Sequence, residues 1–273
     1  MRPSVATLIA LALSTAVGCQ PEHPAQQAHP GAEVRAALTT LSRARIFFGH
    51  QSVGRDILRG VESLSVEYHV PVRVVAIDDR PPDRAPGLFN TNIGSNGDPA
   101  SKCEAFNAIL DQSVEPYYDV AVLKFCYVDL DDESNVATAG ELFDEYVAAL
   151  KRVQMRHPQL RLVIATIPLH ADPPGWRTAL KRLLGRATWT DSANLRRNQF
   201  NDAVRAAFAN RPLFDVARLE STRADGSANG FETEGRHVET LAAEYTTDGG
   251  HLNTAGQRRL ATGFVLAVAN AQR

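Results

Sequence analysis

The sequence has little of what several classes of protein require. Three cysteines among 273 residues are too few for a disulfide scaffold, and the formal net charge is only -2. The charges are mixed along the chain without a basic stripe, which argues against a nucleic-acid partner. No internal repeat and no glycine-rich phosphate loop is visible. The apolar run from Val5 to Val17 is too short to cross about 30 Å of hydrocarbon.

The histidines and acidic residues do not form a metal-ligand pattern. His157, His170 and His237 are scattered, with no recurring short spacing to cysteine, aspartate or glutamate. The acidic run 129–133 lacks the spaced oxygen ligands and the glycine of a calcium loop, so we interpret it as a solvated loop or a cap for the following helix. We therefore predict no metal site and no cofactor.

The residues around the apolar run are typical of an export signal. Arg2 precedes the run, Gly18 and Cys19 follow it, and a stretch rich in proline, glutamine and histidine continues to about residue 30. The order Ala-Val-Gly-Cys over residues 16–19 resembles a bacterial lipoprotein signal, in which Cys19 becomes the lipidated first residue. Cleavage near the same place without lipid, which gives a soluble secreted protein, is the alternative.

The lipoprotein resemblance implies a membrane partner, because a lipid on Cys19 holds a protein at a membrane without spanning it. The implied location is the bacterial cell envelope, on the periplasmic or outer-membrane side, and Gln20 allows transfer to an outer membrane. We expect residues 1–18 to be a signal peptide and 19–40 a lipid-attached flexible tether and lead-in. Residues 41–273 are then long enough for one domain with a sizeable core.

The two cysteines after Cys19 have two interpretations. An oxidising compartment permits a bridge between Cys103 and Cys126. Two small buried thiols are an equally good interpretation, because the sequence does not show whether the two residues meet. Both alternatives stay open at this point.

Apolar runs alternate with helical periodicity after the tether. Five runs are predicted to be strands: 44–48, 70–77, 120–125, 160–167 and 212–216. Apolar residues at helical spacing predict helices at about 53–64, 102–112, 142–153, 192–209 and 254–270. Long loops are predicted at 78–99, 171–190 and 218–247. Because helical crossovers join parallel neighbours, the pattern predicts an α/β fold with a five-stranded parallel sheet covered on both faces.

The segment T-D-G-G-H-L-N-T-A, residues 247–255, sets Asp248 and His251 three residues apart at a predicted loop-to-helix junction. In acyl-transfer sites a carboxylate holds one ring nitrogen of a histidine, so that the other nitrogen can take a proton from a nucleophile. Ser52 is the best candidate nucleophile, because it follows the first strand and begins the first helix. Taken alone, Ser52 or the segment with Asp248 and His251 is as typical of an ordinary helix start as of a catalytic site. Their joint placement at the carboxyl edge of one sheet favours the catalytic interpretation.

These residues resemble the SGNH (GDSL-like) hydrolase superfamily. That family has its serine after the first strand in a Gly-x-Ser block and an Asp-x-x-His block near the C-terminus, and residues 245–261 are similar to its D-G-x-H-L-N-x-x-G form. Residues 194–201 and 165–168 resemble the family's fourth helix and the end of its fourth strand. The resemblance spans roughly residues 45–267. It implies a flavodoxin-like three-layer α/β/α sandwich.

By this resemblance, Ser52 is the nucleophile, His251 is the general base and then the acid, and Asp248 orients His251. The implied oxyanion hole takes a glycine N–H from the loop after the second strand, where Gly94 or Gly97 can supply the N–H and Asn96 an amide. The sequence does not distinguish between them.

The first block departs from the family pattern. The run Gly-His-Gln-Ser over residues 49–52 has one residue more between glycine and serine than the family's block. His50 thus stands between the glycine and Gln51, two positions before the serine. We interpret His50 either as a hydrogen-bonded turn residue or as a substrate contact.

The third block departs further. Asp129 fits the last position of the family's Gly-x-Asn-Asp, but Val128 stands in the asparagine's place and cannot donate a hydrogen bond. Losing one such donor costs about 10²-fold to 10³-fold in rate, and the nearest substitutes in type are Asn96 and Tyr127. Lys124, at the end of a buried strand, is expected to pair with Asp129 or with the aspartates after the second strand, or else to reach the sheet edge.

The site and the resemblance together imply a serine esterase that works through an acyl-enzyme. The implied substrates are small-molecule or glycan esters with short acyl groups, such as carbohydrate acetyl esters. Trp176 and Trp189 either stack on a sugar or pack in the protein. A carbohydrate O-acyltransferase with the same triad is the nearest alternative. A non-catalytic envelope binding lipoprotein is the other, which the altered third block supports and the complete serine, histidine and aspartate set opposes.

Overall fold

The computed structural model describes residues 30–77, 83–112, 117–131, 138–172 and 189–273. The expected signal peptide and residues 19–29 of the expected tether and lead-in, Cys19 included, lie outside these residues, as do Trp176 and the side chain of Trp189. Within the described ranges, no helix combines the length and the apolar character needed to cross a membrane.

A six-stranded parallel sheet forms the centre of the fold. Its strands are β1 (Arg45–His50), β2 (Val74–Ala76), β3 (Gly87–Asn92), β4 (Val120–Leu123), β5 (Arg161–Ala165) and β6 (Leu213–Phe214). They lie in the order β2-β3-β1-β4-β5-β6, and every neighbouring pair is parallel. The predicted α/β class and the five predicted strands are confirmed, with shifted ends.

The predicted count of five strands was wrong, because β3 lies within the segment 78–99 that we expected to be a loop. β3 pairs with β1 on one side and with β2 on the other. Its polar residue Asn90 is buried and donates a hydrogen bond to the carbonyl of Val75 at 3.0 Å. Pairing on both edges therefore stabilises a strand whose composition is typical of a loop.

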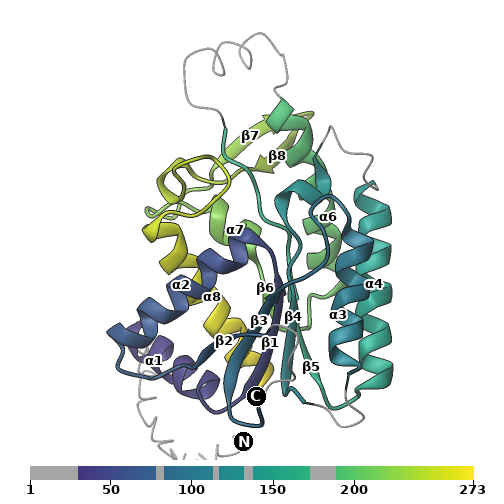
Figure 1. Ribbon diagram of the computed structural model, residues 1–273. Coiled ribbons are helices and arrows are strands. Elements are labelled where there is room, and N and C mark those ends of the chain that lie inside the picture. Colours follow the sequence, from purple (N-terminus) through teal and green to yellow (C-terminus); the bar gives the residue numbers. More distant parts are fainter. Residues whose placement is uncertain (1–29, 78–82, 113–116, 132–137, 173–188) are drawn as a thin grey trace, which may run out of the picture.

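Helices cover both faces of the sheet, as Figure 1 shows. One face carries α1 (Pro30–Leu41), α2 (Ser52–Glu67), α7 (Val216–Ser221) and α8 (Thr254–Ala271), and the other carries α3 (Pro99–Leu110), α4 (Ala139–Arg156) and α6 (Trp189–Ala207). These layers confirm the expected α/β/α sandwich. Helix α1 begins inside the expected tether and lead-in, and Leu38 and Leu41 are buried in the core. The packed part of the chain thus begins before residue 41.

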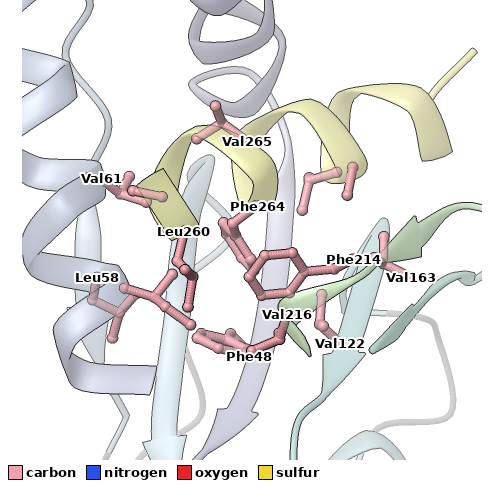
Figure 2. Packing of buried hydrophobic residues seen from close by; sticks show 14 of the residues in the cluster. Phe48, Leu58, Val61, Val122, Val163, Phe214, Val216, Leu260, Phe264 and Val265 are labelled. Atoms are coloured by element: carbon pink, nitrogen blue, oxygen red, sulfur yellow. The ribbon is translucent and has the colours of Figure 1, made fainter. Parts of the chain in front are cut away.

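Aromatic packing fixes α8 against the sheet. Phe264 of α8 packs against Phe48 of β1 and Phe214 of β6, with ring centroids 4.9 Å and 5.4 Å away (Figure 2). Burial of each such side chain stabilises the fold by about 1.5–3 kcal/mol. Because Asp248 and His251 come just before α8, this packing also fixes the helix on which they depend.

The segment 218–247, which we expected to be a loop, contains a hairpin. Strands β7 (Gly230–Thr233) and β8 (Arg236–Glu239) are joined through Glu234 and Gly235, whose φ angles are 50° and 72°. Two consecutive left-handed residues are the geometry of a tight hairpin turn. The expectation of an unbroken loop was therefore wrong.

The two cysteines of the described chain are free. Cys103 lies in α3 and Cys126 follows β4, and both are buried. Burial raises the pKa of Cys103 to about 12, which keeps this thiol protonated. The structure therefore supports the interpretation of Cys103 and Cys126 as buried thiols and not that of a disulfide.

Candidate active site

Asp248 and His251 form a hydrogen-bonded pair just before α8. Oδ2 of Asp248 lies 2.7 Å from Nδ1 of His251. The other oxygen, Oδ1, accepts hydrogen bonds from the backbone N–H groups of Gly250 at 2.9 Å and His251 at 2.7 Å. Because an ionised carboxylate only accepts, Nδ1 carries a proton, and in the neutral ring Nε2 keeps its lone pair. This is the tautomer that a general base needs.

Asp248 is ionised at physiological pH. Burial opposes ionisation, but the hydrogen bonds from Gly250 and from the backbone and ring of His251 outweigh it and hold the pKa of Asp248 far below its usual value. The side chains of Asp248 and His251 are 54% and 44% exposed. A fixed negative charge therefore stands beside an imidazole that solvent reaches.

The backbone around the pair is held by local contacts. Oγ1 of Thr246 donates to the carbonyl of His251 at 2.6 Å and accepts from the N–H of Gly249 at 3.0 Å. Gly249 has a φ of +93°, and its carbonyl accepts a hydrogen bond from Ala171, after β5, at 2.8 Å. The side chain of Asn253 then caps α8. These contacts hold the carboxylate and the imidazole in place.

Ser52 is the first residue of α2 and follows the end of β1 closely. The N–H groups of a first helical turn have no partner within the helix and lie at the positive end of its dipole. Asp56, on the next turn of α2, accepts a hydrogen bond from the backbone N–H of Leu252 at 3.1 Å. Since Leu252 follows His251, this hydrogen bond ties the helix of the serine to the segment that carries the imidazole.

The serine hydroxyl and the imidazole are not in hydrogen-bond contact in the structure. Within the described residues, no hydrogen bond joins Ser52 to His251. Such contacts between nucleophile and base are often long before substrate binds. The structure thus ties the helix that begins at Ser52 to the segment that carries the Asp248–His251 pair.

The loop after β3 is held beside Ser52 by Gln51. Nε2 of Gln51 donates to the carbonyl of Ile93 at 2.6 Å and to that of Gly94 at 3.0 Å. Gly94 is exposed and has a φ of +52°, so it stays a candidate oxyanion donor. The N–H of Gly97 instead donates to a carboxylate oxygen at 2.9 Å. This engagement corrects the expectation that either glycine can serve, because the Gly97 N–H is already used.

The partner of Lys124 differs from those we expected. Asp129 pairs with Lys102, whose Nζ lies 2.7 and 2.6 Å from its two oxygens. Lys124 is fully buried and donates to the carbonyl of Phe125 at 3.0 Å. Burial lowers the pKa of Lys124. The expected pairing of Lys124 with Asp129 was wrong, as was the expectation that it reaches the edge, and the aspartates at 78–79 lie outside the described residues.

His50 is a buried turn residue. Only 2% of it is exposed, and its ring centroid lies 4.9 Å from that of Phe48. Nδ1 is 2.8 Å from the carbonyl oxygen of Gln51, and Nε2 is 3.3 Å from Oδ1 of Asn90. Burial lowers the pKa of His50 to about 4, so the ring is neutral. Of its two interpretations, the structure supports the hydrogen-bonded turn residue and not the substrate contact.

The ring of Tyr127 lies between the rings of His251 and His170 in a chain of ring contacts. Tyr127, in the short helix η1 (Tyr127–Leu130), has its ring centroid 6.3 Å from that of His251 and 5.6 Å from that of His170. A Cβ on Gly250 would lie 2.7 Å from the Tyr127 hydroxyl, so the close approach requires glycine. Burial raises the pKa of Tyr127 to about 12, which keeps its hydroxyl a donor. Tyr127 therefore stays a candidate donor to substrate.

Three residues at the site, His170, Gln51 and Asp56, were not among the candidates that the sequence indicated. His170 had a usable signal, since it follows β5 and so lies at the sheet edge where sites gather. Gln51 and Asp56 had none. Their partners, residues 93–94 and Leu252, are distant in the sequence, and only the fold brings them together.

Histidine and carboxylate side chains meet only in pairs in the described ranges. No group of three or more histidine, cysteine, aspartate or glutamate residues is arranged there to hold a metal ion. His157 contacts Asp111 at 2.9 Å and His237 contacts Glu232 at 2.9 Å. Each pair offers one nitrogen and one carboxylate.

No protein-family model and no curated protein matches the chain. Similar solved structures include a candidate GDSL-like lipase from Parabacteroides merdae, with 14% identity, a TM-score of 0.48 and coverage of 83% of this chain and 95% of that one. A family 3 carbohydrate esterase from Talaromyces cellulolyticus has 13% identity, a TM-score of 0.42 and coverage of 81% and 92%. An acetyl esterase variant with acetate has 12% identity, a TM-score of 0.48 and coverage of 84% and 99%. At such identities and TM-scores, these likenesses assign no activity to this chain.

Proposed function

We propose that the protein is a serine esterase in which Ser52 is the nucleophile, His251 the base and Asp248 the residue that orients the base. The Asp248–His251 geometry carries this proposal, because the carboxylate fixes Nδ1 at 2.7 Å and leaves Nε2 for a proton. The hydrogen bond from Leu252 to Asp56 supports the assignment of the serine, since it ties the base segment to the start of α2.

In this mechanism Oγ of Ser52 attacks the ester carbonyl carbon while its proton moves to Nε2 of His251. The charge of the tetrahedral intermediate develops near the start of α2, where the positive end of the helix dipole stabilises it. His251 then donates the proton to the leaving alcohol, and an acyl group remains on Ser52. Water that loses its proton to the same Nε2 then attacks the acyl carbon. The bond from this carbon to Oγ of Ser52 breaks, His251 returns the proton to Oγ, and the acid is released.

The proposed substrates are esters with short acyl groups, including O-acetyl groups on carbohydrate. The exposure of Asp248 and His251 supports this class, because a bulky alcohol can approach the pair from solvent. Exposure also favours hydrolysis over transfer to a second sugar, since water reaches the imidazole freely.

We also propose that a lipid on Cys19 holds the protein in the bacterial envelope. Expression of the full chain in a bacterium tests this, with the membrane and soluble fractions compared for the wild type and Cys19→Ala. The wild type should fractionate with membranes and the variant should not. A wild type that stays soluble would contradict the anchor.

Hydrolysis of 4-nitrophenyl acetate tests the esterase. The purified protein should release nitrophenol, and Ser52→Ala and His251→Ala should each abolish turnover while circular dichroism shows an unchanged fold. Ser63→Ala is a matched control, because Ser63 is an exposed serine of the same helix whose hydroxyl donates to the carbonyl of Arg59. Turnover that persists in Ser52→Ala would refute the nucleophile.

A further inference from the structure

A buried ion pair contacts the loop that follows β3, residues 93–98. The side chains of Lys102, in α3, and Asp129, in η1, are both fully buried. The two oxygens of Asp129 also accept the backbone N–H groups of Gly97 at 2.9 Å and Cys126 at 2.8 Å. The ion pair therefore joins the loop after β3 to the turn after β4, and hydrogen bonds satisfy both charged groups.

The same ammonium group fixes the orientation of Asn96. Nζ of Lys102 lies 3.1 Å from Oδ1 of Asn96, which is an exposed residue. A lysine ammonium only donates hydrogen bonds, so the oxygen of this amide must face it. Because the amide group is planar, Nδ2 and its two protons point away from the buried pair. The contact with Lys102 thus fixes the direction in which the side-chain amide of Asn96 donates its hydrogen bonds.

The start of this loop is anchored beside the proposed nucleophile. Gln51 precedes Ser52 and holds the carbonyls of Ile93 and Gly94. The N–H of Ile93 also donates to the carbonyl of His50 at 3.0 Å, which extends the pairing of β1 and β3 beyond β3. The loop is therefore tied at its start to the residue before the serine and at its end to the buried ion pair.

We propose that the side-chain amide of Asn96 is an oxyanion donor of this site and that Lys102 and Asp129 are positioning residues for it. The proposal rests on the proposed esterase function. It explains how the site works although Val128 has no donor to offer from the turn after β4. In this arrangement that turn contributes Asp129, which acts through Lys102 on the neighbouring loop. A donor held in advance needs no reorganisation when negative charge develops on the substrate.

The test compares Asn96→Asp, Asn96→Ala and the wild type in steady-state hydrolysis of 4-nitrophenyl acetate. Asn96→Asp keeps an oxygen toward Lys102 but replaces the donor with a second acceptor. We expect kcat to fall about 10²-fold or more in both variants with little change in KM and melting temperature. Asn92→Asp is the matched control, because it adds the same charge at an exposed position at the end of β3, and its kcat should stay near that of the wild type.

If Asn96 has only a structural role, Asn96→Asp should keep the kcat of the wild type, because the contact with Lys102 survives. A kcat of this variant within about twofold of the wild type would therefore overturn the proposal. If Ser52-dependent turnover is present and only the Asn96 effect is missing, the donor assignment alone fails. If the wild type shows no Ser52-dependent turnover, the esterase function and the donor assignment fail together.

Lys102→Met tests the positioning step. If Lys102 acts through Asn96, the folded double variant with Asn96→Ala should have the same kcat as Asn96→Ala alone. If the kcat loss of the double variant is instead the product of the two single losses, Lys102 acts independently of Asn96. That result would contradict this part of the proposal. Should Lys102→Met fail to fold, the Asn96→Asp comparison decides the proposal by itself.

Discussion

Asp56 accepts a hydrogen bond from the backbone N–H of Leu252 at 3.1 Å, although 196 positions separate the two residues in the chain. Both residues are buried, at 6% and 5% exposure, so water does not compete for this contact. Asp56 lies one turn after the proposed nucleophile, and Leu252 lies one residue after the proposed base. This hydrogen bond thereby holds the helix of Ser52 and the loop of His251 together.

This contact predicts a difference between two substitutions of Asp56. Asp56→Ala leaves the Leu252 N–H buried without an acceptor, which should lower the free energy of unfolding by about 1–3 kcal/mol and reduce kcat. Asp56→Asn keeps an oxygen at the same place and should lose much less of both. Urea unfolding and ester hydrolysis measure the two effects. Equal losses in the two variants would contradict the role of the hydrogen bond.

A methyl group at Gly250 should disturb the site without unfolding the protein. Its Cβ would lie 2.7 Å from the hydroxyl of Tyr127, so either that ring or the segment before His251 must shift. Displacements near 1 Å in active sites cost up to about 10²-fold in rate, and we expect a kcat loss of this order for Gly250→Ala. Gly140→Ala is the control, since a Cβ there meets only Thr138, at 3.9 Å. A Gly250→Ala protein with normal kcat would contradict this packing.

Glu220 should make stability depend on pH. It is fully buried in α7, where Oε2 accepts the N–H of Leu169 at 2.6 Å and Oε1 has no hydrogen-bond partner among the described residues. Burial raises the pKa of Glu220 from 4.5 to about 8, against the opposing charges of Lys124 and Arg197. Because the folded pKa is the higher one, the stabilising contribution is complete below about pH 4.5 and is lost as the pH rises through about 8.

Glu220→Gln tests this dependence, because the amide keeps the contact with Leu169 and does not titrate. The free energy of unfolding of the wild type should fall relative to that of the variant between about pH 5 and pH 8. Urea unfolding of both proteins across this range measures the difference. A difference that does not change with pH would contradict the raised pKa.

The sequence predicted the parts of the fold that local patterns encode. Apolar runs marked β1, β4 and β5 because these strands are buried on both faces, and periodicity marked α8. In contrast, β3 carries Asn90 and other polar residues, and only its pairing with two neighbouring strands makes it a strand. The turn at Glu234 and Gly235 lacks the asparagine or aspartate that usually signals such a hairpin.

The candidate site follows the same division. The contact of Asp248 with His251 spans three residues, so the spacing predicted it. The contacts of Gln51 with residues 93–94 and of Lys102 with Asp129 depend on how separate segments dock. No local pattern encodes such docking. The sequence therefore suggested Lys124 as the partner of Asp129, whereas the structure pairs Asp129 with Lys102.

Covalent labelling tests the central claim, the nucleophilic role of Ser52, most directly. A fluorophosphonate reacts with an activated serine hydroxyl and leaves a stable adduct that intact-mass measurement and peptide mapping locate. We predict one adduct, on Ser52, which is absent in Ser52→Ala and forms much more slowly in His251→Ala. Labelling that continues unchanged in Ser52→Ala, or an adduct mapped to another serine of the wild type, would contradict the account.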